Sequence, residues 1–316
     1  MRPWPPAVKL AAALLPICLP AQEAVFRVDV SLVRILATVK DGQGRPVGSL
    51  DKDDFEVRDN GAPQTVTTFE RSTELPLSVA LMVDSSASTG IEAKYQVQSV
   101  SRFLKALFSE GNPKDAAALY TFNYEVTRRN YFTRNAQPIE ESLRLVKNEA
   151  GTAMYDAIYL GSQDLENRDG RRVMVLVTDG GDTSSGKDFH AALEAAQIGD
   201  AVIYAVLVLP ITNNPGRNTG GEHALALLTS GTGGRVFAPS GASGMESAFL
   251  EILRDLRTQY LLGYYPKNVP LSGNRFHKLE VGIKRPGLRV SARNGYYGEA
   301  AAQPEPARGK VSIVPK

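Results

Sequence analysis

The sequence predicts an α/β protein with a doubly wound, mostly parallel sheet that carries helices on both faces. The main observation is that short apolar runs alternate with amphipathic helical patterns across residues 76–257, as in strand–helix–strand units. A second observation concerns the flanks, where apolar residues recur at every other position and indicate half-buried strands. We therefore expect a β-sandwich-like annexe, built from the N- and C-terminal segments, beside the α/β domain.

The first 21 residues have the features of a secretory signal peptide. A basic start precedes an apolar stretch over residues 10–19, and Ala21 provides a small residue for cleavage. This stretch is too short to span a bilayer, and no later segment approaches about 20 apolar residues. We expect an exported protein, in the periplasm, at the cell surface or outside the cell, with no transmembrane segment in its mature chain.

Cysteine content and charge exclude several classes of function. The only cysteine, Cys18, lies within the signal peptide, so the mature chain has no disulfide and no cysteine nucleophile. The whole chain has 36 basic and 34 acidic residues, a formal net charge of +2. Because this near balance gives no basic surface for a polyanion, we do not expect nucleic acid as a partner.

The predicted organisation follows these changes of pattern along the chain. Asn60 and Gly61 predict a turn between strands near residues 55–57 and 66–69, and residues 285–287 predict a second hairpin. The expected parts are a signal peptide (1–21), an N-terminal β segment (22–75), the α/β domain (76–257), a C-terminal β segment (258–298) that packs with the first, and a flexible tail (299–316).

Oxygen-bearing residues follow two of the predicted buried strands and open one helix. Asp84, Ser86 and Ser88 end the strand that begins at Leu77, Thr152 follows a glycine before a helix, and Asp179 ends a later strand. Ligands bind at the carboxyl ends of strands in open α/β sheets. Carboxylates and hydroxyls are hard ligands that suit Mg²⁺ or Mn²⁺. Asp and Ser are also common in turns and at helix N-caps, and Thr152 could serve as such a cap.

Taken together, D-x-S-x-S, the later Gly-Thr and the strand ending T-D-G resemble the metal-ion-dependent adhesion site of the von Willebrand factor type A family, which has a Rossmann-like fold. Asp84, Ser86, Ser88, Thr152 and Asp179 fill all five positions of that motif. The resemblance implies one Mg²⁺ or Mn²⁺ and a protein partner that presents Asp or Glu to the ion. The outer segments resemble an exported subfamily described chiefly in acidobacteria.

Three other patterns point to catalysis, and each departs from its motif. Residues 181–187 read G-x₄-G-K, but Asp188 stands where a phosphate-binding loop carries Ser or Thr, and Asp182 within the loop would repel phosphate. Residues 241–244 resemble a hydrolase elbow, yet Met245 replaces the final glycine. The three histidines, at positions 190, 223 and 277, have no metal-ligand spacing.

The sequence therefore predicts a non-enzymatic, exported module for divalent-cation-dependent protein binding, of the kind used in cell adhesion. Two alternatives remain open at this point. One is a metal-assisted or nucleotide-dependent hydrolase, and the other is a structural module whose metal only stabilises the fold.

Overall fold

The computed structural model describes residues 32–71, 75–87, 89, 93–208, 218–270 and 275–298. The predicted signal peptide, Ser88 and the predicted tail from residue 299 lie outside the described residues.

A six-stranded sheet forms the centre of the α/β domain, in the order β10-β9-β8-β5-β6-β7. All neighbouring pairs are parallel except β6 and β7, so β7 is an antiparallel edge strand. All eight residues of β5 are buried, because helices cover both faces of the sheet. The strands are β5 (Leu77–Asp84), β6 (Ala116–Phe122), β7 (Val126–Thr133), β8 (Arg171–Thr178), β9 (Ala201–Leu207) and β10 (Val236–Phe237).

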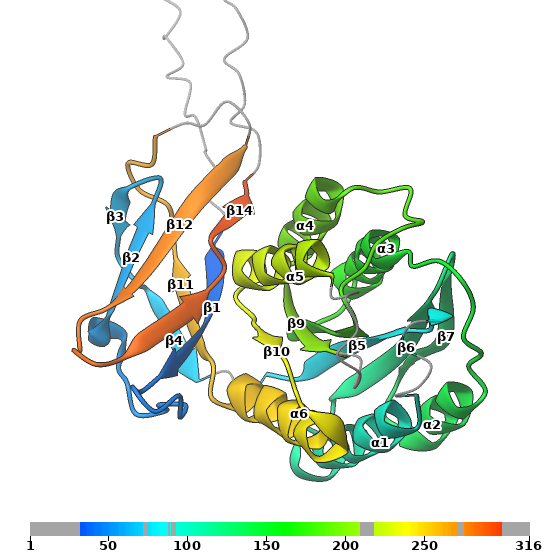
Figure 1. Cartoon of the computed structure of the whole chain (residues 1–316). Helices are drawn as coiled ribbons and strands as arrows, with labels where there is room; N and C mark the ends of the chain where they lie inside the picture. The colour runs from blue at the N-terminus through cyan, green and yellow to red at the C-terminus, as the bar shows by residue number, and fades with distance from the viewer. Residues whose placement is uncertain are drawn as a thin grey trace, which may run out of the picture. The chain divides into compact units, whose positions relative to one another are not determined.

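In the part of the chain that the structure describes, three helices cover each face of this sheet (Figure 1). Alternate β5 residues face opposite sides, so Val79 and Leu81 pack against α1, α2 and α6, whereas Ala80 and Met82 pack against α3, α4 and α5. The doubly wound prediction is confirmed. The helices are α1 (Ala93–Glu110), α2 (Ala136–Arg144), α3 (Met154–Glu166), α4 (Phe189–Ile198), α5 (Thr219–Thr232) and α6 (Gly241–Arg257).

The annexe, which consists of β1–β4 and β11–β14, contains two four-stranded antiparallel sheets. Their orders are β13-β1-β11-β4 and β14-β12-β2-β3, so N- and C-terminal strands pair within both sheets, as predicted. Apolar side chains such as Ile35 and Phe55 form a separate core there. The strands are β1 (Val33–Lys40), β2 (Phe55–Asp59), β3 (Ala62–Gln64), β4 (Thr68–Arg71), β11 (Tyr260–Tyr264), β12 (Phe276–Ile283), β13 (Arg289–Ala292) and β14 (Gly295–Tyr297), and a short 3₁₀ turn, η1 (Lys52–Asp54), precedes β2.

Two predicted hairpins differ from the structure in their partners. Asn60 and Gly61 do form a turn with positive φ, at 46° and 81°, but β2 pairs with β3 there, and the segment near residues 66–69 pairs with β11 in the other sheet. The turn at residues 285–287 joins β12 to β13, which belong to different sheets. Alternation shows which residues face the core, and it does not show which strand lies alongside.

A buried carboxylate organises polar groups inside the annexe. Asp59 is fully buried and accepts hydrogen bonds from the hydroxyls of Tyr264 (2.7 Å) and Tyr296 (2.8 Å). The Nδ1 atom of His277 lies 3.0 Å from the other Asp59 oxygen. Three neighbours therefore satisfy a group that would otherwise destabilise the core.

Candidate metal centre

The carboxyl ends of β5, β6 and β8 lie side by side at one edge of the central sheet. In the parallel register Asp84 is opposite Phe122 of β6, and Val83 is opposite Val177 of β8. The segments that follow these strands therefore start next to one another. This places the residues after Val83 beside those after Val177.

Asp84 is a buried carboxylate, with only 1% of the residue exposed. Its Oδ1 accepts a hydrogen bond from the Ser86 backbone N–H (2.8 Å), and its Oδ2 accepts one from the Thr178 hydroxyl (2.6 Å). Burial is the main cause that raises the pKa of Asp84, and the nearby Asp179 carboxylate raises it further, against the lowering effect of these hydrogen bonds. Neutral donors thus hold a desolvated negative charge at this edge.

The loop after β5 is fixed by contacts on both sides. Ser86 is 3% exposed, and its carbonyl accepts hydrogen bonds from Asn148 Nδ2 (2.8 Å) and the Thr89 hydroxyl (3.0 Å). The hydroxyl of Ser86 also hydrogen-bonds the Asp84 carboxylate, and so helps to lower its pKa. The loop therefore presents Ser86 next to Asp84. Ser88, the third predicted ligand of this loop, is outside the described residues.

Thr152 lies between the ends of β6 and β8. The N–H of the next residue, Ala153, donates to the Asn123 carbonyl (2.6 Å) after β6, and the Thr183 N–H donates to the Thr152 carbonyl (2.8 Å) after β8. The N-cap of α3 is Ala153, so Thr152 is not the cap that its position in the sequence could suggest.

Steric constraints explain why a glycine precedes Thr152. Gly151 has φ of +84°, and a Cβ there would lie 2.6 Å from Ser184 Oγ and 2.8 Å from Tyr124 Cβ. A residue with a side chain would be strained in this conformation and would also clash. The Gly-Thr pair thus lets three loops meet closely at this edge.

Asp179 directly follows β8 and is half-buried. Its Oδ1 accepts a hydrogen bond from the Gly181 N–H (3.0 Å), in a turn where Gly180 has φ of +88°. The parallel register of β5 and β8 places Asp179 near Asp84, whose pKa is raised mainly by burial and further by the Asp179 charge. The structure therefore brings Asp84, Ser86, Thr152 and Asp179 to one edge.

The donor set suits a hard divalent cation. Carboxylate and hydroxyl oxygens are ligands that Mg²⁺ and Mn²⁺ accept. Among the described residues, no group of three or more His, Cys, Asp and Glu side chains could hold a metal. The oxygen-bearing residues that the edge presents are the carboxylates of Asp84 and Asp179 and the hydroxyls of Ser86 and Thr152.

Two acidic residues near the site have roles that the sequence did not reveal. Asp182 accepts hydrogen bonds from the Tyr155 N–H (3.0 Å) and the Ser185 hydroxyl (2.6 Å). Asp156 accepts hydrogen bonds from the N–H groups of Gly186 (2.9 Å) and Lys187 (2.8 Å). A phosphate bound by the G-x₄-G-K segment would need those same N–H groups, and Asp156 occupies them. The only sequence signal was the density of Asp and Ser in this stretch.

The histidines do not complete a catalytic group at this edge. His190 and His223 are exposed on α4 and α5, and His277 lies with Asp59 in the annexe. Gly241, the first residue of the elbow-like motif, simply begins α6 with φ of +65°.

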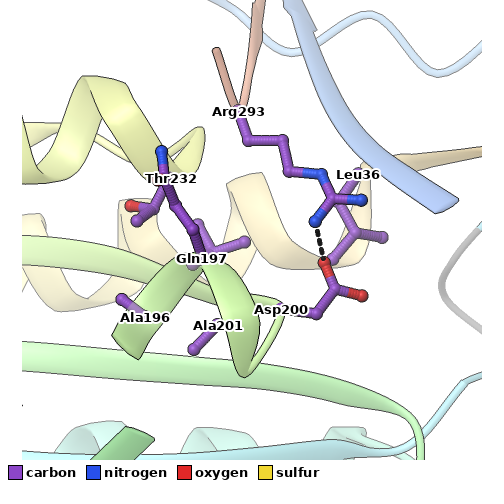
Figure 2. A pocket seen from close by; sticks show the side chains of 8 residues that line it. Leu36, Ala196, Gln197, Asp200, Ala201, Thr232 and Arg293 are labelled. Atoms are coloured by element: carbon purple, nitrogen blue, oxygen red, sulfur yellow. Dashed lines mark ion pairs between the residues drawn. The ribbon is translucent and has the colours of Figure 1, made fainter. Parts of the chain in front are cut away.

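A small pocket lies at the opposite edge of the sheet, near the amino end of β9 (Figure 2). Arg293 and Asp200 face each other there, with 3.0 Å between Nη1 and Oδ1. Asp200 immediately precedes β9, whereas Asp84 is the last residue of β5 and Asp179 directly follows β8. Because this pair of charges is mutually compensated, the pocket offers a weaker case for a binding site than the Asp84 edge.

Comparison with known families identifies the central region. The model of the von Willebrand factor type A domain matches residues 79–181, which include all five predicted site residues. The chain therefore contains a von Willebrand factor type A domain. Comparison with curated proteins found no match.

Solved structures with a similar fold are distant in sequence. The D319A mutant of the PilB minor pilin from Streptococcus sanguinis is 11% identical, with a TM-score of 0.49, over 58% of this chain and 62% of that one. The pilus adhesin SpaC from Lactobacillus rhamnosus GG is 11% identical (TM-score 0.48; 79% and 48%). The vWF domain of the type V pili tip protein Mfa5 from Porphyromonas gingivalis is 21% identical (TM-score 0.33; 35% and 40%). The match covers less than two thirds of each of these chains, and similarities this distant assign no activity.

Proposed function

We propose that this chain is an exported, non-enzymatic adhesion-type module that binds a protein partner through one Mg²⁺ or Mn²⁺. The residues that would hold the ion are Asp84, Ser86, Ser88, Thr152 and Asp179. The observation that supports the proposal is the buried carboxylate of Asp84, which lies near the charge of Asp179 and neutral hydroxyls at the carboxyl ends of the sheet strands. A cation would compensate both negative charges.

The chemistry of this donor set favours binding of an acidic group. Two carboxylates and three neutral hydroxyls would leave a divalent ion short of ligands, because Mg²⁺ prefers octahedral coordination. When bound, the ion would act as a Lewis acid for one more oxygen ligand. An Asp or Glu side chain of a protein partner would supply that ligand together with a compensating charge.

A hydrolase is less well supported, because it would need a general base beside the ion. The carboxylates of Asp156 and Asp182 each accept two or more hydrogen bonds from their own chain, so neither is placed to take a proton from water. The described histidines lie elsewhere in the fold.

Export is part of the proposal. The signal peptide over residues 1–21 would direct the chain to the periplasm, the cell surface or the exterior, and membership of the acidobacterial exported subfamily would agree with this. Among the described helices, none combines the length and the apolar character needed to cross a membrane.

The test is calorimetric titration of residues 22–316 with Mg²⁺ and with Mn²⁺, in the wild type and in Asp84→Ala and Asp179→Ala. Asp188→Ala is the matched control, because Asp188 caps α4 and also follows β8. We expect binding in the wild type and the control, and none in the two site variants. Equal binding by wild type and Asp84→Ala would refute the metal site.

The partner and the role of the ion need a second measurement. A pull-down from the native envelope fraction in Mg²⁺ and in EDTA, with thermal melting in both buffers, separates the alternatives. Partner capture that requires Mg²⁺ supports the proposal. A melting shift with identical capture in both buffers would instead indicate a purely stabilising metal.

A further inference from the structure

The loop after β8 and the start of α3 are joined by reciprocal hydrogen bonds, which we call the clasp. It consists of Thr152, Tyr155 and Asp156 on the α3 side, and of residues 182–187 on the loop side. Each of these two segments also carries a proposed metal ligand. Thr152 is itself part of the clasp, and Asp179 lies three residues before Asp182.

The first half of the clasp caps α3 from outside the helix. The N-cap residue, Ala153, has no side-chain acceptor, so the first N–H groups of the helix need other partners. The Tyr155 N–H donates to Asp182 Oδ2 (3.0 Å), and the Asp156 N–H donates to Ser185 Oγ (3.1 Å). The Ser185 hydroxyl in turn donates to Asp182 (2.6 Å). The loop thus supplies the caps that the helix lacks.

In the second half of the clasp the loop donates most of the hydrogen bonds, and groups on the α3 side accept them. The Asp156 carboxylate accepts hydrogen bonds from two loop N–H groups, those of Gly186 (2.9 Å) and Lys187 (2.8 Å). Thr152 adds main-chain contacts, because its carbonyl accepts from the N–H groups of Thr183 (2.8 Å) and Ser184 (3.1 Å), and its own N–H donates to the Thr183 hydroxyl (3.0 Å). Movement of either segment alone would break several of these bonds.

We propose that Asp156 and Asp182 are positioning residues of the metal centre, which fix Thr152 relative to Asp179 without contacting the ion. This inference rests on the proposed function, since it presumes a divalent cation at the site. Their carboxylates are occupied by donors of their own chain, so they are not placed as ligands. Groups that orient metal ligands typically change metal affinity by about 10–100-fold when they are removed.

The experiment measures Mn²⁺ affinity of residues 22–316 by electron paramagnetic resonance, in wild type, Asp156→Asn and Asp182→Asn. Asp188→Asn is the control, because it removes one negative charge next to the same loop without touching the clasp, and Asn keeps the oxygen that caps α4 by accepting from the Ala191 N–H. We expect about tenfold weaker Mn²⁺ binding in both clasp variants and less than a twofold change in the control. The variant with both Asp156→Asn and Asp182→Asn should show a smaller fold-loss of Mn²⁺ affinity than the product of the two single fold-losses, because both carboxylates hold the same two segments.

Ser185→Ala extends the test without any change of charge. It removes the cap on the Asp156 N–H and a donor to Asp182, and we expect a severalfold loss of Mn²⁺ affinity. Thermal melting in EDTA shows whether each variant is folded at the temperature of the titration. If an aspartate variant is unfolded there, the Ser185→Ala affinity decides the question.

The outcomes separate this inference from the proposed function. Folded clasp variants that bind Mn²⁺ like the wild type would overturn the positioning role while the metal site stands. An equal loss in Asp188→Asn would also overturn it, because charge alone would then explain the effect. A wild type that binds no Mn²⁺ would overturn both proposals.

Discussion

Replacing Asp84 by Asn should stabilise the metal-free protein and abolish its response to Mg²⁺. Asp84 is 1% exposed, and burial is the main reason that its pKa is raised. A raised carboxyl pKa means that the folded protein disfavours the ionised form, which is nevertheless the main form at high pH. Asn has nearly the same shape and no charge, so the substitution removes the desolvation penalty and leaves no cavity.

The magnitude follows from the contacts of the carboxylate. Taking an ion out of water costs several kcal/mol, and each hydrogen bond to a charged group offsets about 1.5–3 kcal/mol of this. Asn retains one oxygen for the Ser86 N–H, and its amide group can donate to the Thr178 hydroxyl, which now donates to Asp84 Oδ2. We expect a net gain of about 1–2 kcal/mol in EDTA, or about 3–6 °C in Tm for a domain of this size.

Magnesium should make the wild type more stable than Asp84→Asn, the reverse of their order in EDTA. A ligand present at a hundredfold excess over its Kd stabilises the folded state by about 2.7 kcal/mol. The wild type would gain this amount, and Asp84→Asn would gain nothing. Differential scanning calorimetry of both proteins, in EDTA and in Mg²⁺, gives the four values needed.

The direction in which stability changes with pH provides an independent test. Between the ordinary Asp value of 3.8 and the raised folded pKa, the folded protein binds more protons than the unfolded chain. Metal-free wild type should therefore gain stability relative to Asp84→Asn as the pH falls through that window. In Mg²⁺ the wild type should instead lose stability there, because protons compete with the ion. An Asp84→Asn protein that is less stable than wild type in EDTA at pH 7 would refute the argument, since Asp84 would then be a structural anchor.

Two further predictions concern the annexe. Asp59→Ala leaves two tyrosine hydroxyls and His277 without their shared acceptor in a buried site, and should lower the free energy of unfolding by about 3–5 kcal/mol in a urea titration; a loss below about 1 kcal/mol would contradict the role of this cluster. Truncation after Thr258 removes the strands that pair with β1, β2 and β4, so residues 33–71 should become sensitive to protease. Unchanged resistance of those residues would show that the N-terminal strands fold alone.

The sequence predicted the features that short-range patterns encode. The buried run of β5 and the small polar residues after it were sufficient to place Asp84 and Ser86 at the edge of a parallel sheet. The Gly-Thr pair and the T-D-G turn were predicted for the same reason, because glycine and strand ends leave a local signal. The described members of the set, Asp84, Ser86, Thr152 and Asp179, then lie together because the topology of the sheet is regular.

Features that depend on which segments meet were not predicted. The sequence around residues 285–287 predicts a simple hairpin. In the structure, however, β13 pairs with β1, which lies some 250 residues earlier in the chain. Likewise, Asp156 and Asp182 are ordinary polar residues when seen in sequence. Their role appears only when α3 and the loop after β8 are adjacent, and each N–H group can be assigned a partner.

The clasp and the buried carboxylate of Asp84 have opposing effects on the position of the loop after β8. Burial is the main cause that raises the pKa of Asp84, and repulsion by the Asp179 carboxylate adds to it. When no cation is present, this repulsion would push the loop after β8 away from the sheet. The bonds between that loop and α3 oppose such movement, and they involve neutral N–H and hydroxyl donors that do not compensate the two charges. The negative potential would thus stay available for a cation while the geometry is held by groups outside the coordination sphere. On this argument a weakened clasp should destabilise the metal-free wild type in EDTA, and should destabilise Asp84→Asn much less, because the repulsion is already gone there.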